Sequence, residues 1–235
     1  MKTGINSVLC AIITNAAICA CFVPFLLLGS KKVRQVNTFW LVGIYWFLNG
    51  LVNLRALPLI RSEVLRGWLL RLSDYYDLMD IPLALSIYAM AAGTRKLRKQ
   101  LLLVLLGYVA GETLLIRLKG YVFSWPVVIG VGVLLILVYS IMGLWQYLKK
   151  MEHDRLENCM AFVHGAFLFA YGTYGIIYLL FYLRASATFY NQTDSSLLYY
   201  TSLLLSAVVT GIGIWGYGWR GSGRTLPTRY SSSSS

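Results

Sequence analysis

Apolar residues are grouped along the chain into seven long segments, separated by short polar connections. A helix rises about 1.5 Å per residue, so about 20 apolar residues are needed to cross a bilayer. Each segment is close to that length, and the connections are too short for a soluble domain. The pattern predicts an all-α membrane protein with seven transmembrane helices, over residues 7–29, 37–57, 73–93, 100–118, 122–148, 159–183 and 196–219.

A further apolar stripe at helical spacing lies between the second and third segments. Arg61 and Arg66 lie off this stripe, so the segment is amphipathic. Amphipathic helices of this kind lie in the plane of the membrane interface. We therefore expect a short interface helix before the third transmembrane segment, with an apolar face made of Val64, Leu65, Trp68, Leu69 and Leu72.

The composition agrees with a membrane location. Of the 235 residues, 58% are hydrophobic and 13% are charged, whereas soluble domains carry about 25% charged residues. The net charge of +12 would suggest nucleic-acid binding in a soluble protein. Here the basic residues cluster between apolar segments, where they contact anionic lipid head groups. The expected partner is the lipid bilayer, and no nucleic acid is expected.

The distribution of basic residues predicts the orientation. Thirteen of the 21 lysines and arginines flank the segments on one side, including the short basic loops 31–36 and 94–99. By the positive-inside rule, the amino terminus is outside and the carboxyl terminus inside. Residues 1–219 then form a single transmembrane domain. The polar residues 220–235, which end in five serines, are expected to form a disordered cytoplasmic tail.

Three aspartates mark the beginning of the third segment. Asp74, Asp77 and Asp80 are spaced three residues apart and share one face of a helix. Acidic side chains at membrane depth are costly and usually face a bundle interior or a wet cavity. A solvated helix entrance with Asp74 as N-cap is the alternative, but it leaves Asp77 and Asp80 unexplained. Pro82 follows directly and is expected to kink the helix.

The orientation places polar residues of neighbouring segments at the depth of these aspartates. They predict an outward-facing acidic pocket in which arginines compensate the buried carboxylates. The alternative is a basic and aromatic belt, in which arginines and tyrosines extend to the interface. The candidate ligand-binding residues are Asp74, Asp77, Asp80, Glu112, Arg55, Arg117, Asn53, Tyr174 and Tyr178.

No motif for enzymatic chemistry is present in the sequence. There is no GxSxG, Walker or HExxH motif, and the two histidines, His153 and His164, do not form a metal-ligand spacing. The seventh segment contains no lysine for a retinal Schiff base. We therefore expect no catalytic residue, no metal ligand and no cofactor, and the chain is not expected to be an enzyme.

Several glycines lie inside the predicted membrane helices. Gly211, Gly213 and Gly216 spell GxGxxG, but the dinucleotide-binding fingerprint requires a preceding strand. Within a membrane segment, close helix packing explains them better. The same interpretation applies to Gly107 and Gly111 in the fourth segment.

Three stretches have a familiar pattern: DYYDLMDIP from Asp74 to Pro82, FLFAYGTY from Phe167 to Tyr174, and PTRYS from Pro227 to Ser231. The chain resembles bacterial seven-helix membrane proteins of poorly defined role, some of which are similar to the membrane input halves of sensor kinases or membrane-bound transcription regulators. The resemblance implies the bacterial inner (plasma) membrane. Because no kinase, response or DNA-binding domain follows Tyr230, it also implies a separate cytoplasmic or membrane signalling partner.

Three functions are compatible with these patterns. The favoured one is a receptor or sensor that binds a small ligand or a lipid head group from outside through its acidic pocket. The second is a transporter or proton-coupled carrier that uses Asp77, Asp80 and Glu112. A transporter would also need polar residues in the inner half of the membrane domain, opposite the outer acids. The sequence offers His164, Gln146 and Asn158 there. The third is an intramembrane enzyme acting on lipid.

Overall fold

The computed structural model describes residues 2–57, 62–182 and 192–219. This part of the chain contains seven long α-helices, a four-residue α-helix, two 3-10 turns and no strand, which confirms the all-helical prediction. The expected disordered tail, 220–235, lies outside the described residues. The elements are α1 (Lys2–Leu26), η1 (Leu27–Gly29), α2 (Lys31–Arg34), α3 (Asn37–Asn53), η2 (Leu54–Ala56), α4 (Glu63–Ala91), α5 (Arg95–Lys119), α6 (Tyr121–Lys149), α7 (Arg155–Tyr182) and α8 (Gln192–Trp219).

Five of the described helices are long and apolar enough to cross a bilayer, which makes this an integral membrane protein by length and composition. These candidate spans come from α1, α5, α6, α7 and α8. They also expose large apolar side chains to the surroundings: Leu103, Leu106 and Leu134 are each more than 60% exposed. Such surfaces are favourable in contact with lipid and costly in water. The five spans are Val8–Gly29, Arg95–Lys119, Phe123–Lys149, Arg155–Leu179 and Ser195–Gly218.

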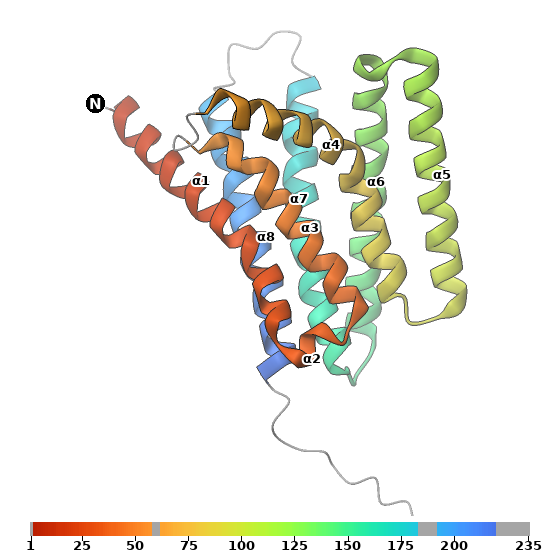
Figure 1. The fold of residues 1–235 in the computed structure, drawn as a ribbon. Coiled ribbons are helices and arrows are strands. Elements are labelled where there is room, and N and C mark those ends of the chain that lie inside the picture. Colours follow the sequence, from red (N-terminus) through yellow and green to blue (C-terminus); the bar gives the residue numbers. More distant parts are fainter. Residues whose placement is uncertain (1, 58–61, 183–191, 220–235) are drawn as a thin grey trace, which may run out of the picture.

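Helix α4 differs from the prediction. The expected interface helix and the third transmembrane segment form one continuous helix, Glu63–Ala91. Figure 1 shows that its first part crosses one end of the bundle and its second part runs down beside α6. Val64 and Trp68 on the first part are 78% and 70% exposed, as expected at an interface. Pro82 has no N–H for the Leu78 carbonyl, which gives the bend a physical cause.

Two helix ends, the beginning of α5 and the end of α3, differ from the prediction because local backbone structure sets them. The fourth segment was expected to begin at residue 100, but α5 begins at Arg95. The Thr94 hydroxyl accepts a hydrogen bond from the Leu97 amide (3.2 Å) and caps the helix. The basic residues before position 100 therefore belong to the helix. Helix α3 ends at Asn53 rather than 57, because η2 follows it.

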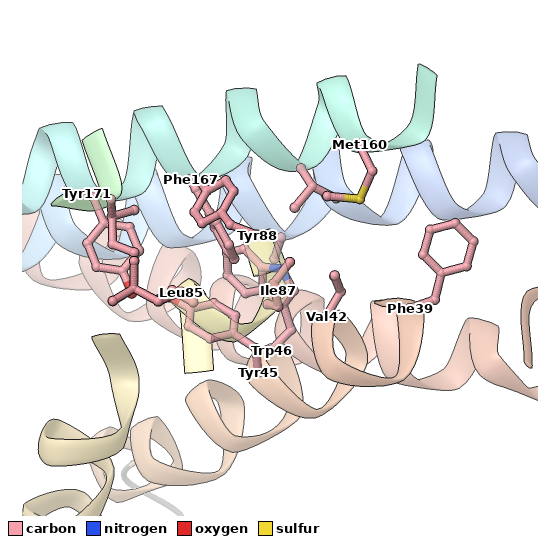
Figure 2. Packing of buried hydrophobic residues seen from close by; sticks show 14 of the residues in the cluster. Phe39, Val42, Tyr45, Trp46, Leu85, Ile87, Tyr88, Met160, Phe167 and Tyr171 are labelled. Atoms are coloured by element: carbon pink, nitrogen blue, oxygen red, sulfur yellow. The ribbon is translucent and has the colours of Figure 1, made fainter. Parts of the chain in front are cut away.

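The core is an aromatic layer between α3, α4 and α7. Figure 2 shows Phe167 and Tyr171 of α7 directed toward α3 and α4. The Phe167 side chain is 0% exposed, and its ring lies 4.9 Å from Tyr45, 5.8 Å from Tyr88 and 6.0 Å from Tyr171 between centroids. In contrast, α5 lies at the edge of the bundle (Figure 1), packed against α4 and α6. The aromatic layer thus centres on α3, α4 and α7, and α5 contributes Leu101, 3% exposed, to the edge of the core.

The glycines predicted to allow close helix packing divide into two groups. A Cβ on Gly213 would lie 2.8 Å from the Phe162 Cβ and 3.3 Å from the Cys159 carbonyl oxygen, so α8 approaches α7 closely there. A Cβ on Gly216, Gly107 or Gly111 would meet no atom within 4 Å. At Gly211 a Cβ would make an ordinary contact, 3.4 Å from Val23 Cγ1. Close packing therefore requires glycine at Gly213 and at none of the other four positions.

Gly213→Ala is expected to lower the free energy of unfolding by about 1–3 kcal/mol, the usual cost of overpacking. The Cys159 carbonyl is part of a helix backbone and cannot move aside cheaply. Gly216→Ala on the same helix is the control, and it should be neutral or stabilising because alanine favours helix. Thermal unfolding in one detergent measures both, and equal effects of the two variants would contradict this packing.

Candidate functional site

A cavity of about 100 Å³ lies among α3, α4, α6, α7 and α8. Six of its 14 lining residues are aromatic, and α4 contributes two carboxylates. The lining residues are Tyr45, Trp46, Asn49, Tyr76, Asp77, Asp80, Ile81, Ile129, Ala170, Tyr171, Tyr174, Tyr199, Ser202 and Leu203. The helix that carries the carboxylates begins at the same end of the bundle as the amino end of α1 (Figure 1).

Asp80 is held in place by tyrosine hydroxyls. The Tyr76 hydroxyl donates to its Oδ1 at 2.8 Å, and the Tyr171 hydroxyl donates to its Oδ2 at 2.9 Å. Tyr76 precedes Asp80 by four residues, so both side chains lie on the same face of α4. The Tyr45 hydroxyl in turn donates to the Tyr171 hydroxyl at 3.1 Å. One carboxylate therefore organises three tyrosines from three different helices.

The three aspartates differ in their surroundings in the order of their depth. Asp74 is exposed and does not line the cavity, Asp77 lines it and is half-buried, and Asp80 lines it with both oxygens hydrogen-bonded. Each step along the helix axis is about 4.5 Å. Asp77 makes no hydrogen bond or ion pair with another described side chain. On this face of α4, Asp74 is therefore exposed at the surface, and Asp77 and Asp80 lie in the cavity wall.

The arginines expected to neutralise these acids do not pair with them. Arg55 and Arg117 are both exposed. Among the described residues the single ion pair joins Lys150 Nζ to Glu157 Oε1 at 2.5 Å, in the connection from α6 to α7. The hydrogen bond to Glu157 raises the pKa of Lys150. Arg55 is near enough for its charge to act on Asp77, but its guanidinium forms no ion pair there.

The other predicted site residues are distributed as follows. Tyr174 lines the cavity. Asn53 supports its wall: Asn53 Nδ2 donates to Asn49 O and Oδ1, both at 2.9 Å, and to the Tyr199 hydroxyl at 3.4 Å. Tyr178 does not line the cavity, and its hydroxyl donates to the Pro126 carbonyl at 2.7 Å. Glu112 is buried on α5 and does not line the cavity either.

Several cavity residues were not among the predicted site residues. Tyr45, Trp46 and Tyr171 lie within long apolar segments, where single aromatic residues are typical of core or interface positions. Tyr76 had a detectable signal, because a tyrosine four residues before an aspartate on a helix places its hydroxyl near the carboxylate. The Tyr76–Asp80 spacing therefore gave a local indication of the site.

A second cavity of about 80 Å³ lies farther along α4 and α7, and it involves His164. The His164 ring stacks on Tyr88 with centroids 5.1 Å apart and 8° between planes. The Tyr88 hydroxyl is 2.6 Å from the Ser140 hydroxyl. Gln146 also lines this cavity, whereas Asn158 accepts a hydrogen bond from the Tyr147 hydroxyl near the exposed end of α7. His164 and Gln146 thus face a second hollow space.

Comparisons with protein-family models, curated proteins and solved structures give no match. Within the described part of the chain, no three or more His, Cys, Asp and Glu side chains are grouped to hold a metal ion. The cavity lined by Asp77, Asp80 and the five tyrosines, here named the aspartate–tyrosine cavity, is therefore the feature that indicates a function.

Proposed function

We propose that the protein is a seven-helix membrane receptor or sensor that binds a small ligand in the cavity around Asp80. The observation that carries this proposal is a carboxylate fixed by Tyr76 and Tyr171 in the wall of a cavity of about 100 Å³. Protein interiors are close-packed, and apolar side chains fill them more cheaply than carboxylates do. A cavity lined by apolar and aromatic side chains with two acids in its wall has the composition of a small-ligand site.

The seven-span topology adds α3 and α4 to the five apolar spans. Helix α3 has 17 residues, which corresponds to about 25 Å, somewhat short of a bilayer core of about 30 Å. It packs against α1 and α4 within the bundle, and much of its surface is buried. The second part of α4 runs beside α6 (Figure 1). These positions support two more spans despite the acids on α4.

The proposed orientation places the cavity toward the outside. The basic segments 31–36 and 94–99 favour the cytoplasm for the opposite end of the bundle. Ligand binding would then change the packing of α3, α4 and α7 and be transmitted to a signalling partner in the cytoplasm or the membrane. The proposed location is the bacterial inner membrane.

The cavity is tested by filling it without changing its charge. Ala170 lines the cavity, and Ala170→Leu adds three carbon atoms to its wall. A panel of small cationic, neutral and anionic compounds is screened by thermal shift on protein in lipid nanodiscs. At least one compound is expected to stabilise the natural chain and not Ala170→Leu. Ala110→Leu, at an exposed position on α5, is the matched control and should behave like the natural chain.

Two outcomes of this screen would contradict the proposal. If every stabilising compound acts equally on Ala170→Leu, ligands bind elsewhere and the cavity is not the site. If no compound of any charge class stabilises the natural chain, the receptor proposal is contradicted. The thermal midpoint of each unliganded variant shows whether Ala170→Leu is folded, so that a loss of binding is not confused with unfolding.

Transport is a second candidate, favoured by the arrangement of the two cavities. Tyr171 lines the first cavity and Tyr88 lines the second. The fully buried Phe167 ring lies between them, 6.0 Å from Tyr171 and 5.8 Å from Tyr88. An aromatic layer that separates two polar cavities is compatible with a closed gate. Asp80 and His164 would then be the polar groups on either side of it.

A further inference from the structure

We infer that the ligand of the aspartate–tyrosine cavity is a small organic ammonium ion. This inference rests on the proposed function, because it names the chemical class of the ligand at that same site. Four features of the cavity carry it: its charge, its aromatic walls, its unused hydrogen-bonding groups and its volume.

The charge of the cavity is unusual for this chain. The protein carries 21 lysines and arginines against nine acids, yet two acids and no basic residue line the cavity. Neither Asp77 nor Asp80 forms an ion pair with a described residue. Carboxylates held away from bulk water are stabilised by an opposite charge within a few ångströms. In this cavity the missing positive charge would be supplied by the ligand.

Aromatic rings supply the second feature. Six aromatic residues line a space of only about 100 Å³: Tyr45, Trp46, Tyr76, Tyr171, Tyr174 and Tyr199. The Tyr45 and Trp46 rings are nearly perpendicular, at 87°, with centroids 5.4 Å apart. Two rings at this angle present their faces in different directions. The negative faces of aromatic rings attract cations, and cages of this type recognise substituted ammonium groups.

Unused hydrogen-bonding groups are the third feature. A carboxylate accepts about four hydrogen bonds, of which tyrosines provide two at Asp80 and none at Asp77. An ammonium group has donors for these remaining positions. Independently, the Trp46 side chain is 0% exposed, and its Nε1 has no partner among the described atoms. Buried N–H groups normally have an acceptor; an alkylammonium ion has none, so a water bound beside the ligand would accept from this N–H.

The volume sets the size of the ligand and argues against a metal ion. An apolar cavity of about 150 Å³ accommodates benzene, which has six non-hydrogen atoms, so about 100 Å³ admits about four to five such atoms. Calcium takes six to eight oxygen ligands, whereas two acids line this cavity and no metal-binding group of three is found in the described chain. A compact alkylammonium group fits both the size and the chemistry.

The matched pair tert-butylammonium and tert-butanol tests the inference, because the two differ only in NH3⁺ against OH. Calorimetric titrations use the full chain in phosphatidylglycerol nanodiscs. We expect tert-butylammonium to bind at least about tenfold more tightly than tert-butanol, since a charge-assisted hydrogen bond contributes about 1.5 kcal/mol or more. Asp77→Asn should remove most of this preference. Glu63→Gln, at an exposed acid on the same helix, should retain it.

The outcomes separate this inference from the proposed function. Equal binding of tert-butanol, or tighter binding of the anion pivalate, would overturn the ammonium inference. The receptor proposal would still stand if Ala170→Leu abolished that binding. Absence of tert-butylammonium binding also overturns the ammonium inference. The receptor proposal is then tested separately by the thermal-shift screen of cationic, neutral and anionic compounds.

An ammonium group also occurs on lipid head groups, and the same titration distinguishes the two sources. In nanodiscs that contain phosphatidylethanolamine, a lipid ligand would compete with tert-butylammonium and weaken its apparent affinity. Unchanged affinity in these nanodiscs would indicate a free amine. In both cases Asp77→Asn must weaken the binding of tert-butylammonium, or the inference fails.

Discussion

Asp77→Asn and Asp80→Asn are each expected to abolish ligand binding and cellular function while the protein stays folded. Both side chains line the cavity, and the amide removes the negative charge without changing the size of the side chain. The amide oxygen introduced by Asp80→Asn would still accept a hydrogen bond from a tyrosine, so the local structure should persist. Loss of one charge-assisted interaction predicts at least about a tenfold loss of affinity.

Asp74→Asn is the matched control for these two variants, because Asp74 is exposed and does not line the cavity. Binding of tert-butylammonium and the thermal midpoint are measured for all three variants, together with the phenotype of each in a deletion strain. Asp74→Asn should be nearly silent. If Asp77→Asn and Asp80→Asn instead unfold the protein and Asp74→Asn alone removes function, the deeper aspartates are structural and the site lies at the surface.

Phe167→Ala is expected to give the largest loss of stability, about 3–5 kcal/mol. Its side chain is 0% exposed and contacts aromatic rings from three helices, including Tyr45, Tyr88 and Tyr171. Truncation would leave a cavity at the centre of the layer in Figure 2, and packed aromatic neighbours cannot collapse to fill it. Thermal unfolding in nanodiscs measures the effect.

Phe162→Ala on the same helix is the control for Phe167→Ala, because Phe162 is 45% exposed and should cost far less. Equal effects of the two variants would show that the aromatic layer does not hold the helices together.

Flux measurements on the natural chain and on Phe167→Ala in liposomes test transport. A proton or amine flux that rises in Phe167→Ala would support the gate, and no flux in either protein would leave receptor function as the better account.

The fold was largely predictable because segment length and hydrophobicity decide membrane helices. All seven predicted segments correspond to helices, since backbone groups in a bilayer must bond within the helix. The details that failed depend on local structure. The Thr94 cap extends α5 to Arg95. The interface helix continues into the third segment as α4, because no glycine or proline separates Leu72 from Ser73.

The candidate site was predictable in part. Depth along the helices predicted that Asp77, Asp80 and Tyr174 lie close together, and all three line one cavity. Depth alone does not give the position of a helix in the bundle, so Glu112 was placed in the pocket although α5 lies at the edge. The arginines were expected to neutralise the acids, but Asp80 instead accepts hydrogen bonds from two uncharged tyrosine hydroxyls. Tyr45 and Tyr171 join the site through contacts between distant segments, which one sequence does not reveal.

The most direct measurement is a crystal structure of the full chain grown with tert-butylammonium and refined beside a ligand-free crystal. The account predicts ligand density inside the cavity, within hydrogen-bond distance of Asp77 or Asp80 and enclosed by Trp46 and Tyr171. Density that is found only on the lipid-facing surface, or a cavity identical in both crystals, would contradict it.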